Sequence, residues 1–399
     1  MTRATPGRLW KYVCGPLRLT AYFRAPGDGR GRPQIPAAAL VWALVIGQIL
    51  RECSFHGVEA LVRSPARRAL RVARSFGDDT LAYFTERLEP EPTRTALAAT
   101  VRQAKRNKAF GHWIGLALEG TAAGHGQAEG CALCHPVRDA KDQVIGYLHH
   151  FTMISVVGTG LALPFDVEPY GPGDSEYVAG QRLLARAITR VGPRFADDVV
   201  VDGEFATAPF LHVASDLGLP VVARLKNNLP TLLAAAAARF TAQPPTLPLD
   251  DGGEHIELWD ADDFDPWATL RWPTVRVLRY RQHQRQGAVV EAYWLTDLPP
   301  QRVSSRLLYR FAKSRWEIEN AGFNDGKTRH GMAHLTHHHA NSLLVGWLLT
   351  ILALTIERLY RLRYLHRGRH RPVTAIAFVR ALRLSWCPPR RSAPAAAPG

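Results

Sequence analysis

Cysteine is scarce in this chain, with five residues among 399. They are Cys14, Cys53, Cys131, Cys134 and Cys387. Because their number is odd and their spacing is sparse, the sequence predicts no disulfide framework. The first residues also lack the succession of basic, apolar and small segments that marks a secretory signal. We therefore expect a cytoplasmic protein.

Long apolar runs are missing as well. The longest, 343–356, has about 14 residues, whereas a helix needs roughly 20 to span a bilayer. The run at 35–50 is similar in length and is interrupted by Gly47 and Gln48. Both runs are predicted to be buried core helices, and we expect no membrane association.

Acidic residues are the minority charge. The chain has 50 Lys plus Arg against 35 Asp plus Glu, which gives a net charge of +15. Such an excess favours a polyanionic partner, nucleic acid first and an anionic membrane second. The length and the 46% of hydrophobic residues are sufficient for more than one domain core.

The first part of the chain divides into two segments. Residues 1–34 are rich in Arg, Gly and Pro and are predicted to form a loosely ordered basic arm. In 35–110 apolar positions recur at three- and four-residue steps, which predicts a helical N-terminal DNA-binding domain. Five arginines follow the same steps: Arg63, Arg67, Arg68, Arg71 and Arg74. On one helix they would form a basic face suited to phosphates, with Arg67 and Arg71 as contacts. An ordinary solvated helix surface is the alternative.

The pattern changes in 111–228, where strand-like and helical segments alternate. Two short apolar runs, WIGLALEG at 113–120 and DVVVDGEF at 198–205, lead to Glu119 and Asp202. The alternation predicts a mixed α/β sheet flanked by helices. Because such sheets bind ligands beyond the carboxyl ends of their strands, we expect the two acids to converge there.

The remaining chain completes this core. Residues 229–300 contain several Pro and Gly breaks and alternating β-type runs, so they are predicted to form a β-rich insertion in the catalytic core. Long helices are predicted in 301–365. The segment 366–399 is basic and rich in Pro and Ala, and we expect it to be disordered.

A third acid lies in the stretch RWEIENAGFNDGK, residues 315–327. In a helix Arg315 and Glu319 share one face, because they are four residues apart. Lys327 would lie about 80° from Glu319 at 100° per residue. One carboxylate between two cations suits a helix that binds both a metal ion and phosphates. The alternative is a solvated helix with surface salt bridges.

Glu119, Asp202 and Glu319 together offer only carboxylate oxygens. Such a set suits hard divalent cations, Mg²⁺ or Mn²⁺. Two such ions could activate a water or a 3′-hydroxyl on one side and stabilise the leaving oxygen on the other.

Two motifs carry a resemblance to a known family. ARLKNN (223–228), which follows VVDGEF, and the helix at 315–327 resemble bacterial insertion-sequence transposases of the DDE class. More narrowly, they resemble the branch with a Tyr-Arg-Glu-Lys signature and a β-rich insertion in its catalytic domain. The similarity covers about residues 111–360. It implies an RNase H-like fold, and an enzyme that nicks transposon ends with water and joins the 3′ end to target DNA.

The resemblance also implies roles for individual residues and for partners. Asp202 matches the second acid and Glu319 the third, with Mg²⁺ or Mn²⁺ as cofactor. Arg315 and Lys327 match the cations that grip DNA, and Arg224, Lys226 and Tyr309 are further candidate contacts. The implied partner is double-stranded DNA, both transposon ends and target, bound by a homodimer in association with the bacterial nucleoid.

The sequence departs from the family pattern at three positions. The first acid is Glu119 in EGT, where the family has aspartate in DGT; glutamate extends its carboxylate by about 1.5 Å. A misplacement of about 1 Å can cost roughly a hundredfold in rate. Ala312 stands at the position of the family's signature tyrosine, and Tyr309 is nearby. Lys327 lies one residue further from Glu319 than in the family pattern. A catalytically impaired or repurposed DNA-binding relative, or an RNase H-like nuclease, therefore stands beside an active transposase.

Cys131 and Cys134 form a single C-x-x-C motif. A zinc site that also uses His125 or His135 is one interpretation. Because a second pair is missing, two packed thiols in a turn are favoured. The run 337–339 of three histidines is predicted to contact DNA or solvent, since helical neighbours point about 100° apart.

Overall fold

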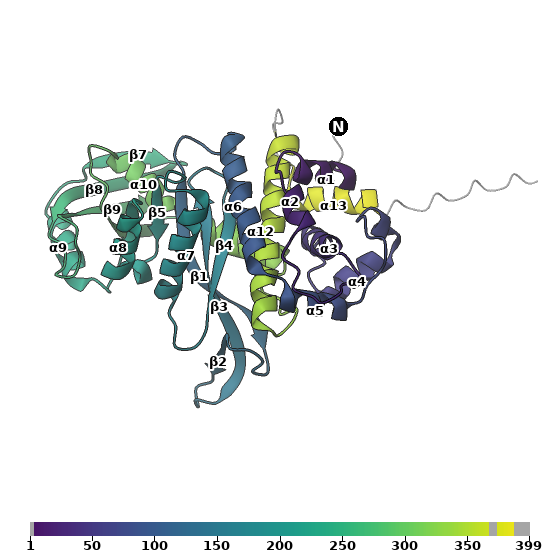
Figure 1. The fold of residues 1–399 in the computed structure, drawn as a ribbon. Coiled ribbons are helices and arrows are strands. Elements are labelled where there is room, and N and C mark those ends of the chain that lie inside the picture. The colour runs from purple at the N-terminus through teal and green to yellow at the C-terminus, as the bar shows by residue number, and fades with distance from the viewer. Residues whose placement is uncertain (1–3, 367–372, 387–399) are drawn as a thin grey trace, which may run out of the picture.

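A computed structural model describes residues 4–366 and 373–386. A large mixed sheet runs through it in the spatial order β2-β3-β1-β5-β6-β10-β9-β8-β7, and β4 pairs with β3 (Figure 1). The strands are β1 (Gly115–Gly126), β2 (Cys134–Arg138), β3 (Val144–Val157), β4 (Leu163–Tyr170), β5 (Asp198–Val201), β6 (Val221–Leu225), β7 (Leu247–Asp251), β8 (Glu254–Phe264), β9 (Val275–His283) and β10 (Val289–Thr296). With helices packed against this sheet, the predicted mixed α/β fold is confirmed.

Helices precede, interrupt and follow the strands. The α-helices are α1 (Pro6–Cys14), α2 (Thr20–Arg24), α3 (Ala37–Leu50), α4 (Phe55–Arg63), α5 (Asp78–Arg87), α6 (Pro90–Arg106), α7 (Glu176–Val191), α8 (Ala208–Asp216), α9 (Pro230–Thr241), α10 (Ser305–Ser314), α11 (Asp325–Arg329), α12 (Ala340–Arg361) and α13 (Ala375–Trp386). Two 3₁₀ turns, η1 (Pro65–Arg68) and η2 (Gly203–Phe205), and two π-helical segments, η3 (Ile318–Asn324) and η4 (Leu362–His366), complete the set.

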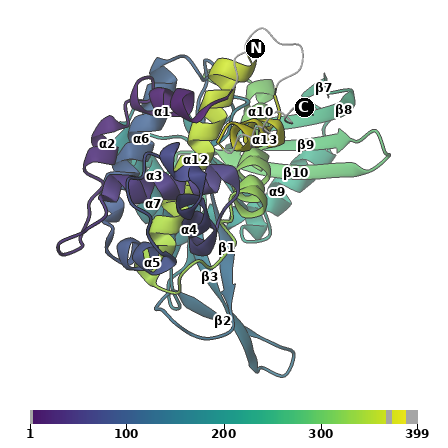
Figure 2. The ribbon, with the colours of Figure 1, turned by 90° about the vertical axis from the view of Figure 1, so that its right-hand side faces the viewer.

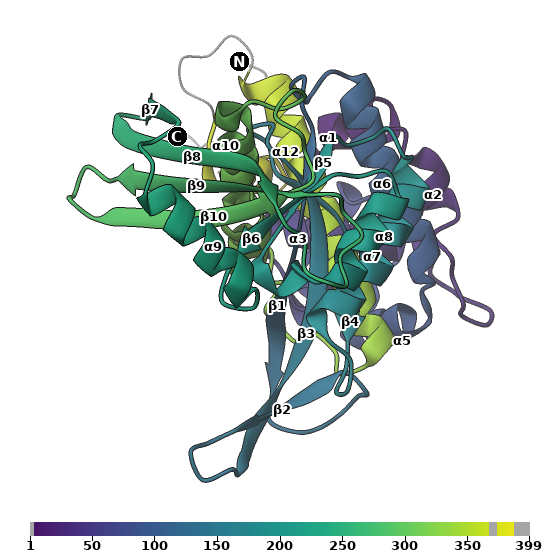
Figure 3. The same cartoon turned by 90° about the vertical axis from the view of Figure 1, so that its left-hand side faces the viewer.

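The parallel strands β1, β5 and β6 form the centre of the sheet. Where they pair in parallel, these strands are mostly aliphatic, as expected for strands buried on both faces; Val199, Val200 and Val201 of β5 are fully buried. Helix α7 packs on β1, β3 and β4, and α12 packs on β4. The edge formed by β2 and the adjoining parts of β1 and β3 projects beyond these helices (Figures 1 and 3).

The segment 229–300 continues the main sheet. It supplies α9 and the meander β7–β10, and β10 pairs antiparallel with β6 from Tyr293↔Leu225 to Thr296↔Val222. Figure 3 shows these strands extending the sheet on the side of β6. The β-rich character predicted for this segment is therefore found as an extension of the sheet.

Helix α12 lies between the sheet and the N-terminal helices (Figures 1 and 2). It contacts α3, α5, α6 and β4. With η4 it is long and apolar enough to cross a membrane, but 89% of its apolar window is buried in the protein. Helices α3 and α4 pass the same test only as a pair bent by 105°. These are the properties of core helices, as the sequence predicted.

The prediction of a loose arm at 1–34 is wrong. Helices α1 and α2 form there, and Thr5 caps α1 by accepting a hydrogen bond from the Arg8 backbone N–H at 3.4 Å. Leu9 and Val13 are fully buried. The apolar residues between the arginines were sufficient to dock this segment on the helical core.

The tail prediction is also wrong in part. Residues 375–386 form α13, whose Phe378 and Leu382 are fully buried. Arg383 adds an ion pair of 2.8 Å with Glu52. The rest of the predicted disordered tail, 367–372 and 387–399, lies outside the described residues.

The five arginines do not share a helix face. Ser64 and Pro65 end α4, η1 follows, and Arg71 has a positive φ of 57°. Arg71 lies over the Trp10 ring and Arg63 pairs with Glu59 at 2.6 Å. The predicted basic helix face is therefore wrong, because proline removes the N–H needed to continue the helix.

Candidate active site

Two of the three predicted acids lie side by side on adjacent parallel strands. The β1–β5 pairing ends at Leu118↔Val201, so Glu119 and Asp202 are the next residues on each strand. Asp202 follows the end of β5, as predicted. Glu119 was predicted to end its strand, but β1 continues to Gly126 along β3. The acids therefore meet where the parallel pairing stops and the antiparallel pairing continues.

Glu319 joins this pair through Arg315. The Nη1 atom of Arg315 lies 2.9 Å from Glu119 Oε1 and 2.8 Å from Glu319 Oε1. Arg315 is buried, with 8% of its side chain exposed. One guanidinium thus draws together a strand residue and a helix residue that are far apart in the sequence.

The Glu119 carboxyl is the most perturbed group of the site. Burial raises its pKa to about 8; Arg315 opposes this change, whereas Glu319 and Asp202 add to it. Its Oε2 atom is buried and has no hydrogen-bond partner. A buried carboxylate oxygen without a partner is costly, and a bound cation would satisfy it.

The pKa of Asp202 is shifted in the opposite direction, downward. Burial by itself would raise its pKa, but the hydrogen bond from Lys226, the Gly203 N–H and the nearby charges bring the pKa below its usual value. Lys226 Nζ lies 2.6 Å from Asp202 Oδ2. Asn228 Nδ2 donates to the Gly203 carbonyl at 2.8 Å. The DGEF and ARLKNN segments are therefore bound to each other beside the ends of β5 and β6.

A continuous helical stretch carries Arg315, Glu319 and Lys327. It passes from α10 through η3 to α11, and η3 is a π-helix. Lys327 Nζ lies 2.5 Å from Thr121 Oγ1 on β1. A π turn, with its i→i+5 bonding, holds about one residue more than an α turn. This wider turn lies between Arg315 and Lys327 and includes Glu319.

Glu176 is a further acid that the sequence did not indicate. It lies in the first turn of α7, and its Oε1 accepts a hydrogen bond from the Gly120 N–H at 2.8 Å. Burial raises its pKa, and nearby Asp202 adds to the increase. A Cβ atom on Gly120 would lie 2.2 Å from Glu176 Cδ, so the glycine of EGT makes room for this carboxylate. No sequence signal points to Glu176, because an acid in a first helical turn is common.

The donor set fits divalent metal ions. Glu119, Asp202 and Glu319 contribute only oxygens, which hard cations prefer, and Glu119 Oε2 has no other partner. In the part of the chain that the structure describes, these three are not among the groups whose ligand atoms all lie within 4.8 Å of one another. Arg315 lies between two of them, so metal binding at all three requires this side chain to move.

The other predicted DNA contacts have different surroundings. Lys226 is exposed, and Arg224 is half-buried with Nη2 3.3 Å from the Glu291 carbonyl. Tyr309 is only 2% exposed and packs edge-on against Tyr280, so its prediction as a DNA contact is wrong. Arg67 is half-buried and Arg71 exposed. Arg315 faces the acids, and its role as a direct DNA contact stays a prediction.

Cys131 and Cys134 lie close together, with their sulfurs 3.9 Å apart. The predicted partners are wrong: His135 Nε2 contacts the Tyr170 carbonyl at 3.0 Å, and His125 is not part of the cluster, whose thiols instead face His149 and His338. The prediction that His338 contacts DNA or solvent is wrong, because its Nε2 atom lies 3.0 Å from Cys134 Sγ.

Comparison with known proteins adds little at this distance. No protein-family model matches the chain, and no curated protein matches it significantly. Among solved structures, the chain is similar to a piggyBac transposase in a synaptic complex with hairpin DNA, with a TM-score of 0.45 and 11% identity over 96% of this chain and 80% of that chain. A similarity this distant carries no conclusion about function.

Proposed function

We propose that this protein is a DNA transposase of the DDE class, which cleaves DNA at transposon ends and joins the 3′ end to target DNA. The observation that carries the proposal is that Glu119 and Asp202, at the carboxyl ends of paired parallel segments, and Glu319, on the facing helix, all lie near Arg315. The resemblance of the motifs at 198–205, 223–228 and 315–327 to such transposases supports it. So does the mixed sheet, which is compatible with the RNase H-like core that the resemblance implies.

In this proposal Glu119, Asp202 and Glu319 hold Mg²⁺ or Mn²⁺. When bound, such ions activate the attacking oxygen and stabilise the leaving one. In the nicking step a water oxygen forms a bond to phosphorus and the P–O3′ bond breaks, which leaves a 3′-hydroxyl and a 5′-phosphate. In strand transfer that hydroxyl attacks a target phosphodiester. A bond forms between its oxygen and the target phosphorus, the P–O3′ bond of the target strand breaks, and the target leaves with a free 3′-hydroxyl.

The cations around the acids have two roles in the proposal. Arg315 keeps Glu119 and Glu319 together before a metal ion binds. Lys226 holds the Asp202 carboxylate in place. When DNA binds, these cations and Lys327 become available to its phosphates. The net charge of +15 supports a polyanionic partner. Action on two transposon ends implies a homodimer in the DNA complex and a location at the nucleoid.

The first test is a nicking assay. The DNA flanking the gene is searched for terminal inverted repeats, and a plasmid with those ends is incubated with the protein and Mg²⁺ or Mn²⁺. We expect Asp202→Asn and Glu319→Gln to lose nicking by at least about a thousandfold and to retain DNA binding. Glu204→Gln, which changes an exposed acid two residues from Asp202, is the matched control and retains activity.

Two alternatives are decided by the same assays. A repurposed DNA-binding relative binds the ends but never nicks them with either metal ion; Glu119 in place of aspartate favours this candidate. A nuclease nicks but does not join a pre-cleaved 3′-hydroxyl end to a new plasmid. Absence of joining by wild-type protein, under conditions that support nicking, would replace the transposase proposal with the nuclease.

A further inference from the structure

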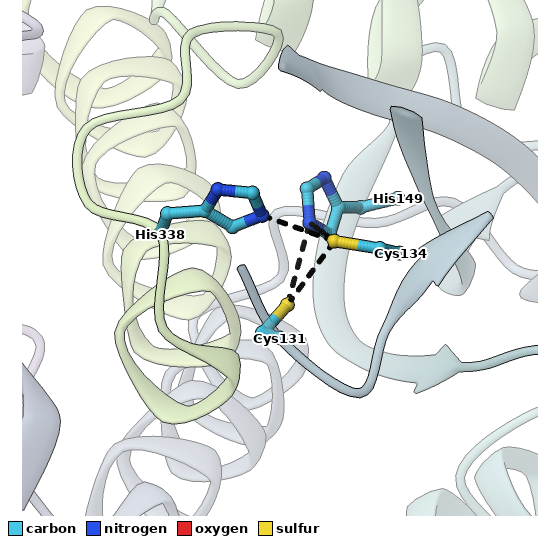
Figure 4. A group of neighbouring side chains, drawn as sticks. All are labelled: Cys131, Cys134, His149 and His338. Atoms are coloured by element: carbon cyan, nitrogen blue, oxygen red, sulfur yellow. Dashed lines mark hydrogen bonds between the residues drawn. The ribbon is translucent and has the colours of Figure 1, made fainter. Parts of the chain in front are cut away.

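Four potential metal ligands from three segments of the chain meet beside the projecting edge of the sheet. Cys131 lies in the turn before β2, Cys134 is the first residue of β2, His149 lies on β3, and His338 comes from the loop before α12. Figure 4 shows the His149 ring directed at both sulfurs and the His338 ring at the sulfur of Cys134. Cys134 and His149 are buried. All four ligand atoms lie within 4.8 Å of one another.

Three distances among these ligand atoms match tetrahedral coordination, and the fourth, from His338 to Cys134, is about 0.5 Å shorter. With Zn–S bonds of about 2.3 Å and Zn–N bonds of about 2.0 Å, tetrahedral ligands lie about 3.8 Å apart for two sulfurs and about 3.5 Å for sulfur and nitrogen. The two sulfurs are 3.9 Å apart, and His149 Nε2 lies 3.4 Å from Cys131 Sγ and 3.5 Å from Cys134 Sγ. His338 Nε2 is 3.0 Å from Cys134 Sγ.

The surroundings hold His149 in the form that a metal ion requires. Its Nδ1 atom lies 2.7 Å from the Gly124 carbonyl, which can only accept a hydrogen bond. The proton is therefore on Nδ1, and the Nε2 lone pair points at the thiols. A second hydrogen bond of this kind commonly orients histidine ligands of metals.

Two glycines leave space for the rings. Gly124 has a φ of +68°, and a Cβ there would lie 3.3 Å from His149 Nδ1. A Cβ on Gly130 would lie 2.4 Å from His338 Nδ1. Two packed thiols in a turn would need neither the histidines nor these glycines, and 3.9 Å between sulfurs is too long for a disulfide.

We propose that Cys131, Cys134, His149 and His338 bind one structural zinc ion. A Cys₂His₂ set occupies all four tetrahedral positions, so no place remains for water or substrate, and the site is structural rather than catalytic. This inference does not depend on the proposed transposase reaction.

The ion would join two parts of the candidate active site. His338 belongs to the loop that links α11 to α12, and that loop also receives a hydrogen bond from Gly124 N to the Ala333 carbonyl at 3.2 Å. Gly124 lies on β1, the strand of Glu119, whereas α11 carries Lys327. Zinc at this position would tie the projecting edge of the sheet to the segment that follows the helix of Glu319.

The test begins with the metal content of the purified full-length protein, measured by mass spectrometry after dialysis. We expect about one zinc per chain, and at least a fivefold lower content in Cys134→Ser and in His338→Ala. Two matched controls should keep their zinc. Cys53→Ser removes a free thiol elsewhere, and His135→Ala removes the histidine that follows Cys134 but faces Tyr170.

A cobalt(II) titration followed by visible absorption is a second test, and it does not depend on the variants folding. Wild-type protein stripped of metal and titrated with cobalt(II) should develop the intense visible d–d bands of a tetrahedral site, together with thiolate charge-transfer absorption, and saturate at about one equivalent. Added zinc should then remove the colour. Wild-type protein that binds neither zinc nor cobalt(II) with these properties would overturn the proposal, as would equal loss of zinc from the two control variants.

Discussion

Lys226 Nζ lies 2.6 Å from Asp202 Oδ2, so an acid proposed to bind metal already holds a cation. An exposed pair of this kind is worth up to about 1 kcal/mol, and a metal ion must displace it. We therefore expect Lys226→Ala to bind Mn²⁺ about fivefold more tightly at pH 8 in the absence of DNA. Titration monitored by electron paramagnetic resonance measures this change. Lys226→Arg should behave as wild type, and weaker binding by Lys226→Ala would contradict the expectation.

Arg315→Ala should destabilise the metal-free protein. It leaves Glu119 and Glu319 without their shared hydrogen-bond donor, and because Glu119 is protonated below about pH 8 and Glu319 is 33% exposed, the loss is that of hydrogen bonds to a charged group, about 1.5–3 kcal/mol. Urea unfolding measures the loss, and Mg²⁺ should restore part of it by replacing the cation. Arg329→Ala is the matched control, because it removes the partly exposed pair of Arg329 with Asp325 and should cost less than about 1 kcal/mol. Equal losses in the two variants would contradict this account.

The affinity for Mn²⁺ should depend on the ionisation of Glu119. Burial raises the pKa of this carboxyl to about 8, so below that pH it is protonated in the metal-free protein. A bound cation must release the proton, and affinity should rise about tenfold per pH unit up to about pH 8 and then level off. Calorimetry between pH 6 and 9 measures this slope. Glu119→Gln should bind more weakly and without the slope, and a flat wild-type profile would be contrary evidence.

Asp198 should make the protein less stable as pH rises. It is fully buried, accepts a hydrogen bond of 2.7 Å from Trp113 Nε1, and has a pKa raised from 3.8 to about 7 by burial. The folded state therefore holds the proton more tightly than the unfolded state, and stability is lost as pH rises from about 4 to 7. At about 1.4 kcal/mol per pKa unit, the loss is of the order of 4 kcal/mol.

Asp198→Asn tests this assignment, because the amide oxygen can still accept from Trp113 and carries no charge. We expect the variant to be more stable than wild type at pH 8 and to differ little from it at pH 4.5. Thermal melts at both pH values measure the difference. Asp216→Asn, at the exposed end of α8, serves as the control, and an Asp198→Asn variant that gains nothing at pH 8 would refute the assignment.

Tyr309→Phe should leave DNA affinity unchanged within about twofold. The side chain is buried against Tyr280, and Asp251 lies near its hydroxyl. Removing the hydroxyl forfeits at most this one interaction, so stability should change by about 1 kcal/mol. Fluorescence anisotropy with labelled duplex measures binding. A tenfold weaker complex would return Tyr309 to the DNA surface.

The positions of Glu119 and Asp202 were predictable because each follows an apolar run, and parallel strands align their carboxyl ends. The contacts of Asp202 with Lys226 and of Glu119 with Arg315 were not predictable, since they depend on side-chain geometry. The arginine series at 63–74 misled for a local reason. Its spacing is helical, but the Ser64–Pro65 step ends the helix, and tertiary contacts then place each guanidinium separately.

The partners of Cys131 and Cys134 could not be found by spacing. His149 lies opposite Cys134 across β2 and β3, a register that only the folded hairpin defines. His338 is 204 residues from Cys134. The nearer histidines were chosen because short ligand spacings are common, whereas the fold brings in distant ones.

The π-helical turn at 318–324 lies in a helical stretch that is held at both ends. Arg315 before it and Lys327 after it each contact a residue of β1, so both ends of the stretch are anchored to the same strand. Deleting one residue from this turn would return it to α-helical bonding, and the two anchors would then bear the strain of the shorter connection. The wider turn therefore sets the length of helix that fits between the two contacts with β1.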